Sequence, residues 1–128
     1  MAMVLVVDDD ESLLEMMRHM LQRYGFEVCT VRNGREAESL LRDEPALDLL
    51  ITDIFMPEMD GVETLRLFRE LRPELPAIAM SGGTNAISGD ILELVGKLGF
   101  RHRLEKPFTP DQLYAVVRTA LGGPSPCG

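Results

Sequence analysis

Short apolar runs alternate along this chain with longer segments in which apolar residues recur at helical spacing. The run 3–7 is wholly apolar, and the run 47–51 is apolar except for Asp48. Such runs are typical of strands that are buried on both faces of a parallel sheet. Weaker patterns of the same kind predict three further strands, at 26–30, 77–80 and 101–105. The chain is therefore expected to contain five strands.

A helix is expected after each strand. The residues predicted to face the core are Leu13, Met17, Met20 and Leu21 in the first helix, Ala37, Leu40 and Leu41 in the second, Val62, Leu65 and Phe68 in the third, Ile87, Ile91, Leu94, Val95 and Leu98 in the fourth, and Leu113, Val116, Val117 and Leu121 in the fifth. Asp10, Asn33 and Asp60 are expected helix caps, and Thr109-Pro110-Asp111-Gln112 is a complete helix-start signal. The alternation predicts an α/β domain with helices on both faces of a parallel sheet.

The chemistry-bearing residues follow the predicted strands. Asp8 and Asp9 come after the first strand, Asp53 after the third, Ser81 after the fourth and Lys106 after the fifth. Ligands of open α/β sheets bind at this carboxyl edge of the strands. If the first and third strands are neighbours, their carboxylates lie roughly 5 to 10 Å apart. Carboxylates at that separation need a cation to offset their repulsion.

Composition limits the number of domains, the kinds of partner and the cellular location that are expected for this chain. The 128 residues, with a net charge of −8, suffice for one domain, expected at 1–121, with 122–128 as a flexible tail or linker stub. The negative charge opposes direct contact with nucleic acid or an anionic membrane surface. No apolar run reaches the roughly 20 residues of a membrane span, and no signal peptide is evident, so a cytoplasmic protein is expected. Cys29 and Cys127 show no disulfide or metal spacing.

These strand-end residues resemble those of response-regulator receiver domains, the phosphorylated half of two-component signalling, over about 4–121. The resemblance implies a flavodoxin-like (βα)5 fold of strand order 2-1-3-4-5. It also implies a phosphoacceptor at Asp53, with Mg²⁺, or Mn²⁺ in its place, held by Asp8, Asp9, Asp53 and the backbone carbonyl of Phe55. Lys106 and Ser81 would contact the phosphoryl group, with Lys106 pairing with Asp53 in the empty site. The family's Lys-Pro bond is usually cis, so Lys106-Pro107 is expected to be cis.

The resemblance also implies partners. A histidine kinase or a histidine phosphotransfer protein would supply the phosphoryl group, and an output protein or effector domain would receive the change. The chain would catalyse only its own phosphorylation and dephosphorylation, so it is not expected to be an enzyme acting on other molecules. Homodimers through the fourth helix, fifth strand and fifth helix are common in the family.

Two features depart from the family pattern, and a third residue bears on dephosphorylation. Arg103 stands where the family often has the Tyr or Phe whose rotamer reports phosphorylation, so Arg103 would instead pair with an acidic partner, or the output surface would work differently. The connection 81–99 is a few residues longer than is common. Phe55 offers no group to orient an attacking water, which predicts slow self-dephosphorylation; a phosphoryl lifetime of seconds with Mg²⁺ present would contradict this.

Two other classes of protein fit part of the pattern. Asp8-Asp9-Asp10 after an apolar strand also resembles the start of haloacid-dehalogenase-type phosphatases, but these usually need a longer chain and would leave Asp53 without a role. A pseudo-receiver keeps the fold and binds proteins without phosphate turnover, and Arg103 is compatible with it. The intact acidic set favours the phosphoacceptor, and Mg²⁺-dependent binding of beryllofluoride discriminates between the two.

Overall fold

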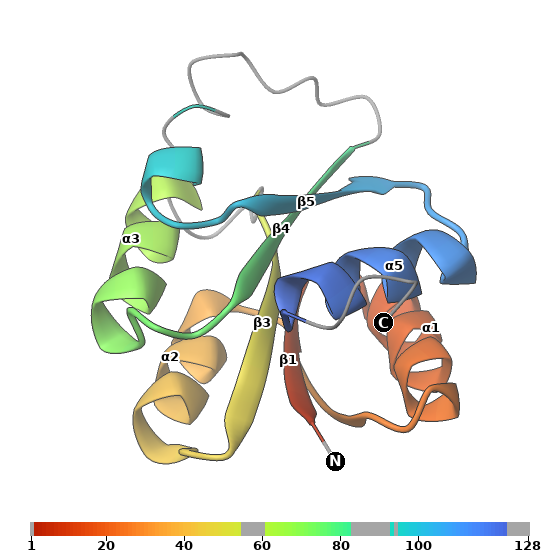
Figure 1. Cartoon of the computed structure of the whole chain (residues 1–128). Coiled ribbons are helices and arrows are strands. Elements are labelled where there is room, and N and C mark those ends of the chain that lie inside the picture. The colour runs from red at the N-terminus through yellow and green to blue at the C-terminus, as the bar shows by residue number, and fades with distance from the viewer. Residues whose placement is uncertain (1, 55–60, 83–92, 94, 123–128) are drawn as a thin grey trace.

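Five parallel strands form one sheet in the order β2-β1-β3-β4-β5 (Figure 1). The computed structural model describes residues 2–54, 61–82, 93 and 95–122. The strands are β1 (Met3–Val7), β2 (Glu27–Val31), β3 (Leu47–Asp53), β4 (Ala77–Gly82) and β5 (His102–Lys106). The fold is therefore the predicted flavodoxin-like one. The predicted ranges for β2 and β5 were one residue too early, and β3 and β4 run on to include Asp53 and Ser81.

Helices cover both faces of this sheet. They are α1 (Glu11–Arg23), α2 (Gly34–Asp43), α3 (Gly61–Leu71) and α5 (Pro110–Ala120). Helices α1 and α5 pack on one face, and α2 and α3 on the other (Figure 1). Residues 93 and 95–97 are also helical, and they lie in the range predicted for the fourth helix. Its Val95 is buried and its Leu98 is half-buried, which agrees with the predicted inner face.

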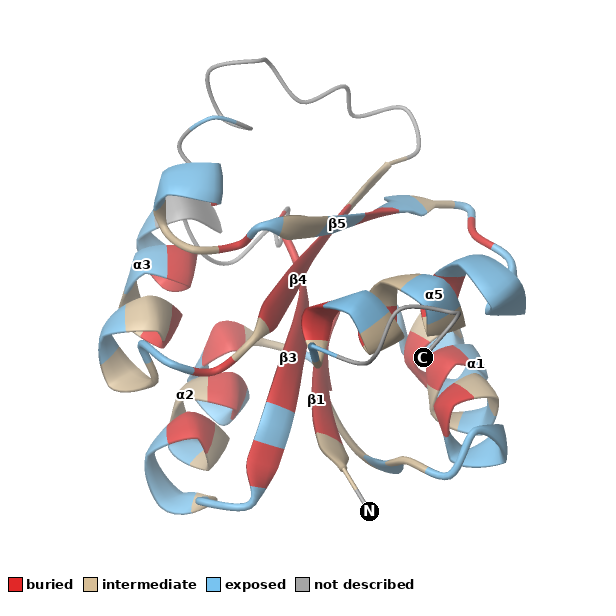
Figure 2. Cartoon of the chain, in the orientation of Figure 1, coloured by how far each residue is buried: buried red, intermediate tan, exposed pale blue. Residues whose placement is uncertain are grey.

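The two-sided burial explains why β1 is wholly apolar. Leu5 and Val7 belong to the core on the side of α2 and α3, whereas Val4 and Val6 belong to the core on the side of α1 and α5. All four side chains are inaccessible to solvent, and Figure 2 shows the same burial along the central strands. Successive strand residues point to opposite faces, so no polar position is tolerated. The strands that end at the acidic residues are thus packed against helices on both faces of the sheet.

The inner face of α1 differs by one position from the prediction. Leu14, Met17 and Leu21 are buried, while Leu13 and Met20 are half-buried at the margins. The spacing i, i+3, i+7 keeps the first three on one stripe, and Leu13 and Met20 flank it. Because Leu13 and Leu14 are adjacent and both apolar, the sequence pattern alone does not show which of them faces the core.

The predicted caps for which the structure gives contacts are confirmed. Asp10 accepts hydrogen bonds from the backbone N–H groups of Ser12 and Leu13, and Asn33 caps α2 through the N–H of Glu36. Thr109 and Gln112 form a reciprocal capping box at the start of α5. The first of these caps fixes where α1 begins, and therefore where the acidic residues before it lie.

Several predictions fall outside the described residues. These are Asp60 as the cap of α3, the side chain of Val62, Ile87, Ile91 and Leu94 in the fourth helix, the carbonyl of Phe55, and all of the predicted tail except Gly122. Among the described helices, none combines the length and the apolar character that crossing a membrane requires.

Candidate functional site

The pairing of β1 with β3 brings two of the predicted carboxylates together. Val7 lies opposite Thr52 in the register, so the next residue of each strand, Asp8 and Asp53, emerges at the same point of the sheet edge. One carboxylate oxygen from each of Asp8, Asp9 and Asp53 lies within 4.8 Å of the others. This separation is slightly shorter than the roughly 5 to 10 Å expected from the sequence. Three carboxylates gathered this closely could hold a metal ion.

The three carboxylates differ in burial. Asp8 is inaccessible to solvent and Asp53 is 7 % exposed, whereas Asp9 is exposed. The N–H of Asp10 donates a hydrogen bond of 2.9 Å to Oδ1 of Asp8, which ties the carboxylate to the start of α1. The buried hydroxyl of Thr52 donates to the backbone carbonyl of Asp53 at 3.1 Å. The site thus combines two buried carboxylates with one that is exposed to solvent.

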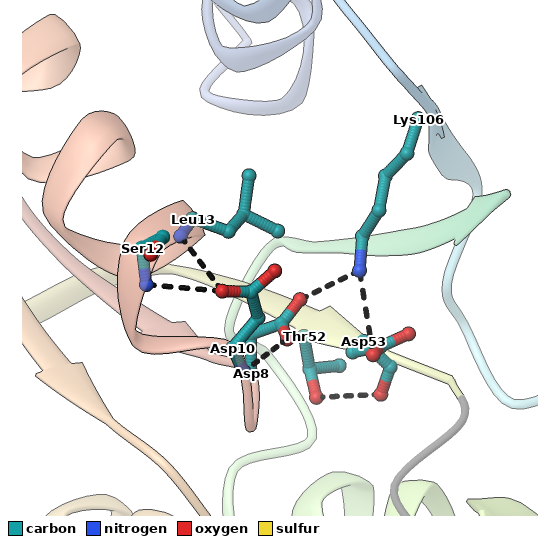
Figure 3. A network of polar contacts seen from close by, with 7 residues as sticks. All are labelled: Asp8, Asp10, Ser12, Leu13, Thr52, Asp53 and Lys106. Atoms are coloured by element: carbon teal, nitrogen blue, oxygen red, sulfur yellow. Dashed lines mark hydrogen bonds and ion pairs between the residues drawn. The ribbon is translucent and has the colours of Figure 1, made fainter. Parts of the chain in front are cut away.

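Lys106 supplies the positive charge of the cluster. Its Nζ lies 2.7 Å from Oδ2 of Asp8 and 3.4 Å from Oδ2 of Asp53 (Figure 3). The peptide bond to Pro107 is cis, as predicted. The expected contact between Lys106 and Asp53 is present, but the shorter contact of Lys106 is to Asp8. Asp8 is the more deeply buried carboxylate, so it gains most from a direct hydrogen bond to an ammonium group.

Burial and charge act in opposite directions on this pair. Burial is the main cause that raises the pKa of Asp8; Asp53 adds to it, while the hydrogen bonds from Lys106 and Asp10 oppose it. Burial alone would lower the pKa of Lys106, but its hydrogen bond to Asp8 and the charges of both carboxylates outweigh burial and raise it. Ionisation of Asp8 therefore has a cost in the folded protein that a bound cation would relieve.

This cost predicts that Asp8→Asn stabilises the protein at pH 7 when divalent cations are chelated. A raised pKa means that ionised Asp8 is less favourable in the folded than in the unfolded state, and this penalty is complete above the folded pKa. As the pH falls through that pKa toward the ordinary Asp range, native Asp8 takes up its proton and the advantage of the variant shrinks. Urea unfolding at several pH values measures it, with Glu105→Gln, an exposed charge removal, as control. A variant less stable than the native chain at pH 7 would contradict the prediction.

The other predicted site residues are placed less completely. Ser81 is half-buried in β4, one residue beyond Met80, which pairs with Asp53. Sequence reasoning missed two residues at this edge, namely Thr52 and Gly82. Gly82 lies opposite Lys106 in the β4–β5 register and approaches its backbone closely. The Gly82-Gly83 pair directly after Ser81 was the available signal, since paired glycines often mark a close backbone approach.

A groove of about 650 Å³ lies along β5 and α5, and Lys106 is among the residues that line it. Residues 103–107 line one side, and Gln112, Ala115, Val116 and Thr119 line the other. Arg103 is exposed at this groove, and within the described part of the chain it makes no hydrogen bond or ion pair. The acidic partner considered for Arg103 is therefore not found among the described residues.

Comparison with known proteins identifies the family. A family model described as the response regulator receiver domain matches residues 4–118. The chain belongs to the response-regulator receiver family. The receiver chain is 33% identical over 119 residues to the transcriptional regulatory protein CpxR of Escherichia coli, covering 92% of this chain and 48% of CpxR.

Solved receiver structures agree with this assignment. The chemotaxis protein CheY4 of Vibrio cholerae superposes with a TM-score of 0.83 at 31% identity, covering 94% of this chain and 98% of that one. The beryllofluoride-activated NtrC4 receiver domain, solved as a dimer, gives a TM-score of 0.84 at 30% identity, covering 95% and 98%. The receiver chain spans about half or less of the length of the curated relatives that it matches.

Proposed function

We propose that this receiver is a phosphoacceptor that takes a phosphoryl group onto Asp53 in a reaction that depends on Mg²⁺. The observation that carries the proposal is the gathering of Asp8, Asp9 and Asp53 within 4.8 Å, with Lys106 Nζ in contact with two of them. In the transfer, the N–P bond of a phosphohistidine breaks, an O–P bond forms to the Asp53 carboxylate, and the histidine leaves. The donor would be a histidine kinase or a histidine phosphotransfer protein.

The donor set fits a hard divalent cation. Carboxylate oxygens are the ligands that Mg²⁺ and Mn²⁺ prefer, and Asp8, Asp9 and Asp53 would hold the ion together with waters. Bound there, the ion would offset the negative charge of the phosphoryl oxygens and of the cluster. The chain's own residues supply the rest. Asp53 is the nucleophile, and Lys106, which already contacts Asp53, would donate to a phosphoryl oxygen. Ser81 would donate to another.

The phosphoryl group would then act as a switch. Lys106 would exchange its contacts to Asp8 and Asp53 for a contact to the phosphoryl group, and this would shift the populations of the arrangements at the sheet edge. An output protein or an effector domain would read the change, in the cytoplasm, and the unpaired Arg103 favours an acidic group on that partner. The chain would therefore turn over only its own aspartyl phosphate.

A pseudo-receiver that binds proteins without phosphate turnover is the second candidate, because Arg103 replaces the usual aromatic residue. Because the chain belongs to the receiver family, the haloacid-dehalogenase-type phosphatase is no longer a candidate. Mg²⁺-dependent binding of beryllofluoride, a phosphoryl analogue, separates the two remaining candidates. Fluorine NMR suits this chain because it contains no Trp for a fluorescence assay. We expect a bound fluorine signal with Mg²⁺ and none without it; absence of the signal in both conditions would favour the pseudo-receiver.

Two neighbouring aspartates provide matched variants for a test of the metal ligands, in which Mg²⁺ affinity is measured by titration. Asp9→Asn removes a carboxylate of the cluster and is expected to weaken Mg²⁺ binding about tenfold. Asp10→Asn removes the same charge one residue later, but it keeps the helix cap, because Asn and Asp cap equally well. Mg²⁺ affinity should therefore change little in Asp10→Asn. Equal losses in both variants would show that only overall charge matters and would contradict the assigned metal ligands.

A further inference from the structure

Asp48 interrupts the apolar start of β3 and is exposed, whereas Leu47 and Leu49 on either side of it are buried. Its Oδ2 accepts a hydrogen bond of 2.8 Å from the backbone N–H of Met3, on β1. Met3 pairs with Leu47 but Val4 pairs with Leu49, so the register of the two strands shifts by one residue here. Asp48 is therefore an extra residue of β3, and its side chain binds the backbone of β1 at the point of the shift.

The packing of the leucines of β3 shows the same extra residue. Side chains alternate along a regular strand, so Leu47 and Leu50 should point to opposite faces of the sheet. Both instead belong to the core on the side of α2 and α3, while Leu49 and Ile51 belong to the core on the side of α1 and α5. Leu47 and Leu49, which a regular strand would place on one face, thus lie on opposite faces.

The shift decides which residue Asp8 meets at the carboxyl edge of the sheet. With the shift, Val7 lies opposite Thr52, and the next residues, Asp8 and Asp53, emerge side by side. If the pairing at the start of the strands continued without the shift, Asp8 would lie opposite Thr52, and Asp53 would point to the other face. Lys106 contacts both carboxylates, and Figure 3 shows these groups turned toward one another. Strand order brings the strand ends to one edge, and the register decides which side chains meet there.

The apolar pattern does not choose between these two registers. Residues 4–7 of β1 and 49–51 of β3 are all apolar and at most 2 % exposed. A pattern fixes the register where only one face of a strand is buried, because a slip then exposes apolar groups. Here both faces are buried, so a slip by one residue replaces one buried apolar side chain by another. The hydrogen bond between Met3 and Asp48 lies at the shift and favours one of the two registers.

We propose that Asp48 is a positioning residue, which sets the register of β1 against β3 and thereby brings Asp8 and Asp53 together. Asp48 touches neither the metal nor the phosphoryl group in this proposal; it acts only through the backbone of β1. Its effect on Mg²⁺ binding rests on the proposed function, but its effect on the register does not. The two effects are therefore measured separately.

Three variants separate the hydrogen bond from the charge of Asp48. Asp48→Ala removes the acceptor, whereas Asp48→Asn keeps an oxygen that can accept from the N–H of Met3 and loses only the charge. Asp43→Ala removes another exposed carboxylate, at the end of α2, and is the matched control. Backbone NOEs between β1 and β3 in isotope-labelled protein without metal give the register, and a titration gives the Mg²⁺ affinity.

In Asp48→Ala we expect a second set of NMR signals, in which the NOEs between β1 and β3 are shifted by one residue. The loss of one hydrogen bond to a charged group changes such an equilibrium by about ten- to hundredfold. The apparent Mg²⁺ affinity should fall in proportion to the fraction of chains that keep the native register, so the NMR populations predict the loss of binding. Asp48→Asn and Asp43→Ala should keep the native register and stay within about threefold of the native affinity.

The outcomes distinguish the register from the proposed function. A single native register in folded Asp48→Ala would overturn the proposal, and so would an equal second set of signals in Asp48→Asn or Asp43→Ala. A shifted register with unchanged Mg²⁺ binding would overturn the role of Asp48 in positioning the site. A native chain that binds no Mg²⁺ would defeat the proposed function and leave the NMR test of the register intact.

Poor folding of Asp48→Ala also has a defined outcome. The variants are then compared in sucrose, which favours the folded state. Failure of Asp48→Ala to fold even there, with Asp48→Asn folded, would overturn the proposal, because Asp48 would then hold the fold as a whole.

Discussion

Lys106→Met should lower the rate at which acetyl phosphate phosphorylates this receiver by about a hundredfold, the usual cost of removing one preorganised donor from a developing negative charge. Met keeps most of the length of the side chain and removes only the ammonium group. That group lies 2.7 Å from Oδ2 of Asp8 and 3.4 Å from Oδ2 of Asp53. Intact mass recorded over time gives the rate.

A second readout separates this effect from misfolding. In the native chain the ammonium group and a divalent cation compete for the same carboxylates, Asp8 and Asp53. Lys106→Met should therefore bind Mg²⁺ about tenfold more tightly while it is phosphorylated more slowly. Lys97→Met is the control, since Lys97 is exposed and pairs with Glu93 on the surface. Weaker Mg²⁺ binding in Lys106→Met, or an equal loss of rate in Lys97→Met, would contradict the role given to Lys106.

Arg69→Met should lower the free energy of unfolding by about 3 to 5 kcal/mol. The guanidinium group of Arg69, on α3, donates to four backbone carbonyls, those of Leu98 at 2.9 Å, Gly99 at 3.0 Å, Arg72 at 3.0 Å and Leu75 at 2.6 Å. These contacts join α3 to the turn before β4 and to the segment that enters β5. Met would leave the carbonyls without their donor, in surroundings that are partly buried.

The surroundings of Arg69 support the size of this effect. The guanidinium carbon lies 5.3 Å from the ring centre of the buried Phe100, and burial lowers the pKa of Arg69. Gly99 has a φ of +98°, and a Cβ there would lie 2.7 Å from Nε of Arg69, so this turn accepts only glycine beside the guanidinium. Arg69 is therefore half-buried, with its guanidinium group between the ring of Phe100 and the turn at Gly99.

Another arginine of α3 provides the control for Arg69→Met. Arg66 is exposed, so Arg66→Met should change the free energy of unfolding by less than about 0.5 kcal/mol. Urea unfolding of both variants measures the difference. Arg69→Lys should fall in between, because one ammonium group cannot reach four carbonyls with the geometry of a guanidinium. If Arg69→Met and Arg66→Met had the same free energy of unfolding, the contacts of Arg69 to the carbonyls would not contribute to stability, and the prediction would be wrong.

The strand-end residues were predictable because their signal is local. A buried parallel strand is an uninterrupted apolar run, so the polar residue that ends it is visible in the sequence, as for Asp8 after Val7 and Asp53 near the end of β3. The sheet then brings these ends together without further information. The caps at Asp10 and Thr109 were predictable for the same reason, since a cap contacts residues only two or three positions away.

Contacts that side chains make with groups distant in the sequence left no such signal. Arg69 lies in the last turn of α3 and Arg72 directly follows the helix, so their sequence positions indicate only a polar helix end. Yet Arg72 donates to the carbonyls of Leu41, Glu44 and Leu47, which lie at and after the end of α2 and at the start of β3. The shorter contact of Lys106 to Asp8 likewise depends on Asp8 being more deeply buried than Asp53. The sequence pattern does not show which of the two carboxylates is more buried. Such contacts follow from how elements pack and not from periodicity.

The central claim is that Asp53 accepts a phosphoryl group with the help of a divalent cation, and intact mass after incubation with acetyl phosphate tests it most directly. The native chain and Asp53→Asn are each incubated with Mg²⁺ and with a chelator. We predict a gain of one phosphoryl group in the native chain with Mg²⁺ and none in the other three samples. A gain in Asp53→Asn, or no gain in any sample, would contradict the claim.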